Sequence, residues 1–247
     1  MRSALSILIL IGGVLITPSV SFAATPCEFS QVFEELNAIK ESGLNSREQI
    51  VKELGLRKTI LHNLSGCFIE EAQAKSEKLK GMTPATPEAK AYVRWLQNQF
   101  VETVSFYQFK STQIQDVGLQ GSKDLAKTLL ERRQSIDQPL LARAVHFEAW
   151  NANQELFTVA TRRLLDITAT LAVFDLPTDH PLSDLLLRAR ESLQVAQNKN
   201  QEAWEALKLS TDDDDVLPLI KSSLEALAES YEIFFEISEL GKKELPL

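Results

Sequence analysis

Apolar residues recur at steps of three and four along almost the whole chain, and this pattern limits the fold more than any other feature. Between residues 139 and 174 the stripe consists of Leu141, Val145, Ala149, Ala152, Leu156, Ala160, Leu164, Ile167, Leu171 and Phe174. This spacing keeps side chains on one face of an α-helix, whereas a strand needs alternation with a period of two. No stretch with a period of two persists. The sequence therefore predicts an all-α fold.

Capping residues and helix breakers divide this pattern into separate helices. Thr86-Pro87 is typical of a helix start, and Gly81 and Gly118 are typical of helix ends. The expected helices cover residues 27–42, 47–80, 87–116, 123–136, 139–174, 182–208 and 215–240. Their long apolar seams suit antiparallel packing at a small crossing angle. We therefore expect an antiparallel helical bundle of about six to seven helices.

The first 23 residues are typical of a secretory signal peptide. Arg2 precedes an apolar run from Leu5 to Ile16, and Ser21-Phe22-Ala23 places small side chains three and one residues before a cleavage point. The run is about 12 residues long, whereas a membrane-spanning helix needs roughly 20. We expect cleavage after Ala23 and a secreted or periplasmic product without a transmembrane segment.

The chain has two cysteines, Cys27 and Cys67. In an oxidising compartment two cysteines most simply form one disulfide, and only one pairing exists. If residues 27–42 and 47–80 form a helical hairpin, the two cysteines lie at nearly the same level of it. The sequence therefore predicts an N-terminal hairpin stapled by one disulfide.

Residues 24–247 are expected to form a single all-α domain. No internal repeat of 30 to 50 residues emerges from the sequence. A boundary near residues 118–122 or near residues 175–181 is the alternative, because both segments contain helix breakers.

Charge and motifs exclude several classes of function. The net charge of −8 argues against a nucleic-acid partner, because phosphate binding needs concentrated Lys and Arg. The three histidines, His62, His146 and His180, stand in no metal-binding pattern. No nucleotide-binding or serine-hydrolase motif occurs, so the sequence predicts no catalytic residue, no metal site and no cofactor. The run from Asp212 to Asp215 is expected to complement the N-terminus of the last helix, with calcium binding as the lesser alternative.

The best candidate for a contact region is a set of aromatic residues in the two ranges 87–116 and 139–174. The set comprises Trp95, Phe100, Tyr107, Phe147 and Trp150. Several aromatic residues fall off the main stripes, so these helices are apolar on more than one face. Such helices are usually central to a bundle, although a groove for an apolar ligand or a partner helix is the alternative.

Together these features favour an exported, non-enzymatic interaction or structural protein of the cell envelope or extracellular space. Its partner is an unknown protein or a second copy of the chain. The alternatives are a helical binder of a small apolar ligand and, behind it, a metal-dependent enzyme or hydrolase with scattered active-site residues. A ligand binder predicts an enclosed apolar cavity, an enzyme predicts buried convergent polar groups, and a scaffold predicts neither.

Overall fold

All regular structure in the described part of the chain is helical, which confirms the predicted all-α class. The computed structural model describes residues 30–41, 47–174, 176–177, 179–209 and 216–245. Its helices are α2 (Ser30–Glu41), α3 (Arg47–Lys80), α4 (Pro87–Gln113), the 3-10 helix η1 (Ile114–Asp116), α5 (Leu119–Arg132), the π-helix η2 (Arg133–Asp137), α6 (Gln138–Ala172), α7 (Pro181–Leu209) and α8 (Val216–Glu244).

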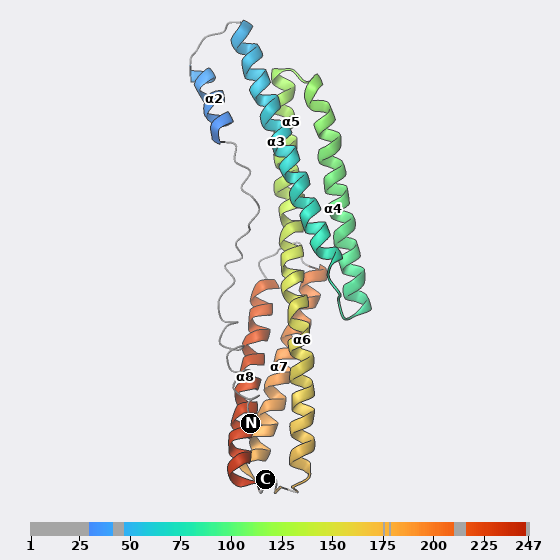
Figure 1. Ribbon diagram of the computed structural model, residues 1–247, viewed down its shortest axis with the longest axis vertical. Helices are drawn as coiled ribbons and strands as arrows, with labels where there is room; N and C mark the ends of the chain where they lie inside the picture. Colours follow the sequence, from blue (N-terminus) through green and yellow to red (C-terminus); the bar gives the residue numbers. More distant parts are fainter. Residues whose placement is uncertain (1–29, 42–46, 175, 178, 210–215, 246–247) are drawn as a thin grey trace.

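The helices form two groups placed end to end (Figure 1). Helices α3, α4 and α5 form the group at one end, here called the upper group, and α2 packs against α3. Helices α7 and α8 pack with the second half of α6 to form the lower group. Neighbours along the chain run antiparallel within each group. The molecule is therefore a long bundle whose two ends share a single continuous helix, α5–η2–α6.

The break predicted between residues 136 and 139 does not exist, and this expectation was wrong. The chain remains helical from Leu119 to Ala172, and η2 carries it past Pro139. A proline inside an α-helix has no N–H to donate, and its ring clashes with the carbonyl four residues earlier. In η2 the pairing is shifted by one residue, so that the Gln138 N–H donates to the Arg133 carbonyl. This π turn accommodates the proline without ending the helix. The other expected helices are present in the described residues, with ends shifted by about one turn or less.

The core consists of three clusters along the length of the molecule. The upper cluster, shared by α3, α4, η1 and α5, contains Leu61, Phe68, Tyr107, Ile114, Leu125 and Leu129. The junction cluster, where the two groups meet, includes Leu79, Leu96, Phe100, Phe147, Trp150, Trp204 and Leu207. The lower cluster, from α6, α7 and α8, includes Phe157, Leu171, Leu193, Leu227 and Phe234. Because the junction cluster takes residues from both groups, apolar packing continues between them.

Helices α7 and α8 meet through small side chains. Ala189 and Ala196 of α7 are completely buried. The Ser192 hydroxyl donates to the Ala226 carbonyl at 2.9 Å, and the Ser230 hydroxyl donates to Ser192 Oγ at 3.1 Å. Small residues let two helix backbones approach closely, and the serine pair satisfies the polar groups that this approach buries.

Several predictions concern residues outside the described part of the chain. The signal peptide, Cys27 and the run from Asp212 to Asp215 all lie there. Cys67 lies half-buried in α3, so its pairing with Cys27 stays a prediction, although the packing of α2 against α3 is consistent with a hairpin. Among the described helices, none combines the length and apolar character needed to cross a membrane.

Candidate functional site

The structure does not bring the five predicted contact residues to one surface. Phe100, Tyr107 and Phe147 are at most 1% exposed, and Trp150 is 5% exposed. Trp95 is 39% exposed and lies on the outer side of α4. Four of the five residues are therefore core residues, of the junction cluster or the upper cluster. With no partner present, the contact region as such stays a prediction.

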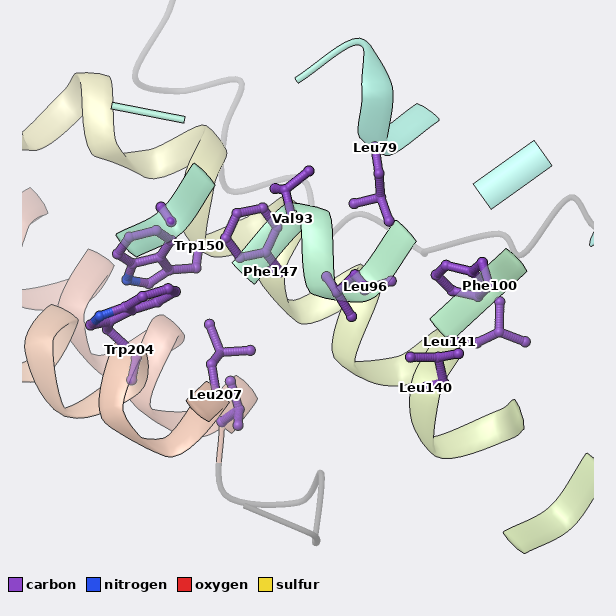
Figure 2. Close-up of a cluster of buried hydrophobic side chains, with 14 of the residues drawn as sticks. Leu79, Val93, Leu96, Phe100, Leu140, Leu141, Phe147, Trp150, Trp204 and Leu207 are labelled. Carbon is purple, nitrogen blue, oxygen red and sulfur yellow. The ribbon is translucent and has the colours of Figure 1, made fainter. Parts of the chain in front are cut away.

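The junction cluster is built around a stack of aromatic rings (Figure 2). The indoles of Trp150 in α6 and Trp204 in α7 lie nearly parallel, with ring centroids 4.5 Å apart and an interplanar angle of 23°. Phe147 lies 5.9 Å from Trp150, and Tyr92 of α4 lies 5.4 Å from Phe147. These offset and tilted contacts are the favourable geometries for aromatic pairs. Trp204 was missed by the sequence analysis, although it occupies an apolar stripe of α7.

Polar groups around the stack fix how α4 and α6 pack on α7. The Trp150 Nε1–H donates to the Asn200 carbonyl at 3.2 Å, and the Tyr92 hydroxyl donates to the Leu207 carbonyl at 2.9 Å. The Gln154 and Asn200 side chains exchange two amide hydrogen bonds, each 3.2 Å long. This half-buried amide pair is satisfied in one register only, so it favours that register over a shifted one.

A hollow of about 300 Å³ lies beside the stacked indoles. Apart from Trp150 and Trp204 its walls are polar side chains: Thr86, Glu88, Gln154, Asn200, Gln201, Glu205 and Lys208. Lys208 pairs with Glu205 at 2.7 Å. The hollow therefore differs from the enclosed apolar cavity that a binder of apolar ligands predicts, and its walls suit a small polar molecule better.

A buried polar site surrounds Asp137, which is 1% exposed. The Thr103 hydroxyl donates to Asp137 Oδ1 at 3.1 Å, and Arg132 Nε donates to the same oxygen at 3.3 Å. The Tyr107 hydroxyl donates to Oδ2 at 2.5 Å. Thr103 and Tyr107 are four residues apart on α4, so both face η2. We call Asp137 and these three donors the Asp137 cluster.

Electrostatics explains why a charged group is tolerated at this depth. Hydrogen bonds to an ionised carboxylate are stronger than neutral ones, and Asp137 accepts three of them. Burial, together with the hydrogen bond to Asp137, raises the pKa of Tyr107 above its ordinary value of 10.0. Tyr107 therefore remains a neutral donor at any physiological pH. The sequence analysis did not identify Asp137 as a buried residue. The available clue was its position, two residues before Pro139 and next to the apolar stripe of residues 139–174.

Arg132, which belongs to the Asp137 cluster, and the adjacent Arg133 contact different helices. The Arg132 guanidinium lies 4.7 Å from the ring centre of Phe106 in α4. The Arg133 guanidinium lies 4.7 Å from the ring centre of Phe68 and 2.5 Å from a carboxylate oxygen of Glu71, both in α3. Glu148 of α6 also pairs with Lys75 and Lys78 of α3. These contacts fasten the shared helix to α3 on one side and to α4 on the other.

His62 and His180 make contacts that stabilise the local structure. His62 lies 3.3 Å from Ser111 Oγ and 3.0 Å from Gln115 Nε2. The Leu182 N–H donates to His180 Nδ1 at 3.1 Å, which caps the start of α7. Within the described residues, no three His, Cys, Asp or Glu side chains are grouped so that they could hold a metal ion.

Comparison of the chain with protein-family models, with curated proteins and with solved structures finds no match.

Proposed function

We propose that the chain is an exported structural or interaction protein of the cell envelope or extracellular space, and that it acts as a stiff helical rod rather than as an enzyme. The observation that carries the proposal is the uninterrupted helical path from Leu119 to Ala172. At 1.5 Å per residue this path is about 80 Å long. It passes through both groups and belongs to all three core clusters.

The side contacts of the shared helix support a role that depends on stiffness. Glu71 and Arg133 join α3 to η2, and Lys75 and Glu148 join α3 to α6. The Asp137 cluster joins α4 to η2, and the amide pair of Gln154 and Asn200 joins α6 to α7. Each of these contacts joins the shared helix to a neighbouring helix at a different position along its length. Such a molecule is suited to holding two attached partners apart at a set distance.

Export and the disulfide between Cys27 and Cys67 belong to the same proposal. The support is the signal-like N-terminus and the pair of cysteines in the sequence. In the predicted hairpin, the disulfide would tie the segment before α2 to α3. The upper end of the rod would then be held covalently as well as by packing.

Mass spectrometry together with small-angle X-ray scattering tests the proposal on full-length protein expressed in a bacterial host. We expect loss of residues 1–23, a mature mass lowered by about two hydrogens, and a scattering profile of an elongated particle. A compact particle would contradict the rod. A retained small molecule would contradict the scaffold role, and retention of residues 1–23 would contradict cleavage.

A photo-crosslinking amino acid in place of Trp95 tests for a partner of the upper group. Trp95 is 39% exposed, and its replacement removes a ring contact with the half-buried Tyr92 but no fully buried side chain. We expect crosslinks to one protein species in the envelope of the source organism. The same amino acid at Phe235, exposed on α8 of the lower group, is the control. Equal crosslinking to many proteins from both positions would contradict a defined partner at the upper group.

A second candidate function is the binding of a small polar molecule in the hollow beside Trp150 and Trp204. It is favoured by the volume of the hollow and by the carboxamide and carboxylate groups in its walls. Native mass spectrometry of the exported protein tests it, because a retained adduct should be lost in Gln201→Ala. Gln201 is exposed, so this change spares the core.

A further inference from the structure

Helix α5 is the least securely held helix of the upper group. It has 14 residues and buries only Ser122, Leu125 and Leu129. An isolated helix of this length is marginal in water, so its order depends on packing. Gly118 at its N-terminus provides no side-chain cap. Whatever holds α5 in place must therefore act on its buried face or at its C-terminal end.

The C-terminal end of α5 runs directly into a weak point of the shared helix. Pro139 has no N–H to donate, so one hydrogen bond of the helical ladder is missing there. Prolines and π turns are the usual sites of bending in long helices. The segment from η2 to Pro139 can therefore bend more easily than the α-helix on either side of it.

The Asp137 cluster lies at this weak point and closes it against α4. Thr103 and Tyr107 hold the carboxylate from α4, and Arg132 holds it from the last turn of α5. The cluster thus connects three elements through one buried carboxylate. Within the described residues, one other hydrogen bond joins α4 to α5. It runs from the Tyr107 hydroxyl to the Leu129 carbonyl and is long, at 3.5 Å.

We propose that α5 and η2 form a lid over the upper cluster, with a hinge at Pro139 and a latch at Asp137, which lies on the lid side of the hinge. With the latch closed, Leu125 and Leu129 cover Tyr107, Phe68 and Leu61. When Asp137 loses its α4 donors, α5 lifts about the hinge and uncovers the apolar groove between α3 and α4. The lid goes beyond the rod function, because it requires neither export nor a partner. The shared helix is stiff while the Asp137 latch is closed and can bend at Pro139 only when the latch opens.

Hydrogen exchange of the full-length protein tests the lid. Asp137→Ala removes the latch, and we expect amide exchange in residues 119–137 to rise about ten- to hundredfold, the range for losing hydrogen bonds to a charged group. Exchange in α7 and α8 should not change. Glu71→Gln is the matched control, because it removes an ion pair from the same π segment without touching the Asp137 cluster. In this control, exchange in residues 119–137 should stay close to that of the wild type.

A second substitution separates a hinge from general loosening. In the Asp137→Ala background, Pro139→Ala restores an N–H to the ladder and should bring exchange in α5 back toward the wild-type rate. Unchanged exchange in Asp137→Ala, an equal rise across the whole chain, or failure of Pro139→Ala to restore protection would each overturn the lid. If Asp137→Ala does not fold, Tyr107→Phe removes one latch hydroxyl while keeping the buried ring, and the same pattern of exchange decides.

Discussion

Ser65 offers a substitution that should make the protein more stable, which is the opposite of what most core substitutions do. Its side chain in α3 is completely buried beside Leu61 and Phe68, and its hydroxyl has no hydrogen-bond partner among the described residues. A buried polar group without a partner loses its bonds to water and gains none in return. Ser65→Ala removes that hydroxyl and should raise the free energy of unfolding.

The expected gain follows from two contributions. An unsatisfied buried hydroxyl costs about 1–3 kcal/mol, and alanine is a better helix former than serine by about half a kcal/mol. The small void left by the missing oxygen offsets part of this gain. We therefore expect Ser65→Ala to be more stable than the wild type by about 1–2 kcal/mol.

Urea denaturation followed by circular dichroism measures the change. With a slope of about 3 kcal/mol per molar urea, the midpoint should rise by about 0.5 M at unchanged slope. Ser230→Ala is the matched control, because Ser230 is equally buried but donates to Ser192 and Ala226. It should lower the free energy of unfolding by about 1 kcal/mol. A midpoint for Ser65→Ala at or below that of the wild type would refute the reasoning.

Three further perturbations follow from the core and from the cysteines. Phe147→Ala should lower the free energy of unfolding by about 3–5 kcal/mol in the same urea assay, because the ring is completely buried in the junction cluster. Tyr107 has a raised pKa when folded, so its contribution to stability is complete below about pH 10, where the unfolded tyrosine begins to ionise, and is lost at higher pH. Urea midpoints between pH 8 and pH 11.5 should therefore fall less steeply in Tyr107→Phe than in the wild type. Cys27→Ser should destabilise the N-terminal hairpin by about 4 kcal/mol if Cys27 pairs with Cys67. Alkylation of Cys67 in the denatured, unreduced wild type would contradict that pairing.

The sequence predicted most of the helices because their causes are local. Thr86 caps α4 by accepting from the Ala89 N–H, as the Thr-Pro pair suggested. The stripe predicted for residues 139–174 faces the core only in part, because Leu141, Ala160 and Leu171 are buried whereas Leu156 is exposed. The separation of α5 from α6 was predicted wrongly because Pro139 ends a helix in most contexts. Here the buried contacts of Asp137 with α4 favour a π turn, and such contacts between distant residues leave no periodic trace in the sequence.

The candidate site was less predictable than the fold. The clustering of aromatic residues identified Phe147 and Trp150 as candidates for a contact region. It did not show that Trp204, more than 50 positions later, stacks on Trp150. Whether an aromatic side chain faces solvent or another helix depends on which helices become neighbours. Periodicity gives the apolar face of each helix separately and does not give the pairing of faces between them.

The shared helix also affects the order in which the chain can fold. The upper group has its complete set of helices once α5 has been synthesised, whereas the lower half of α6 has no partners until α7 and α8 follow. At about 5–20 residues per second, the stretch from Ala172 to Glu244 takes roughly 4–14 s to synthesise. During that time Phe157, Ala160 and Leu171, all buried in the finished molecule, have only solvent or a chaperone to cover them. The nascent lower half of α6 is therefore the segment most exposed to aggregation while the protein is being made.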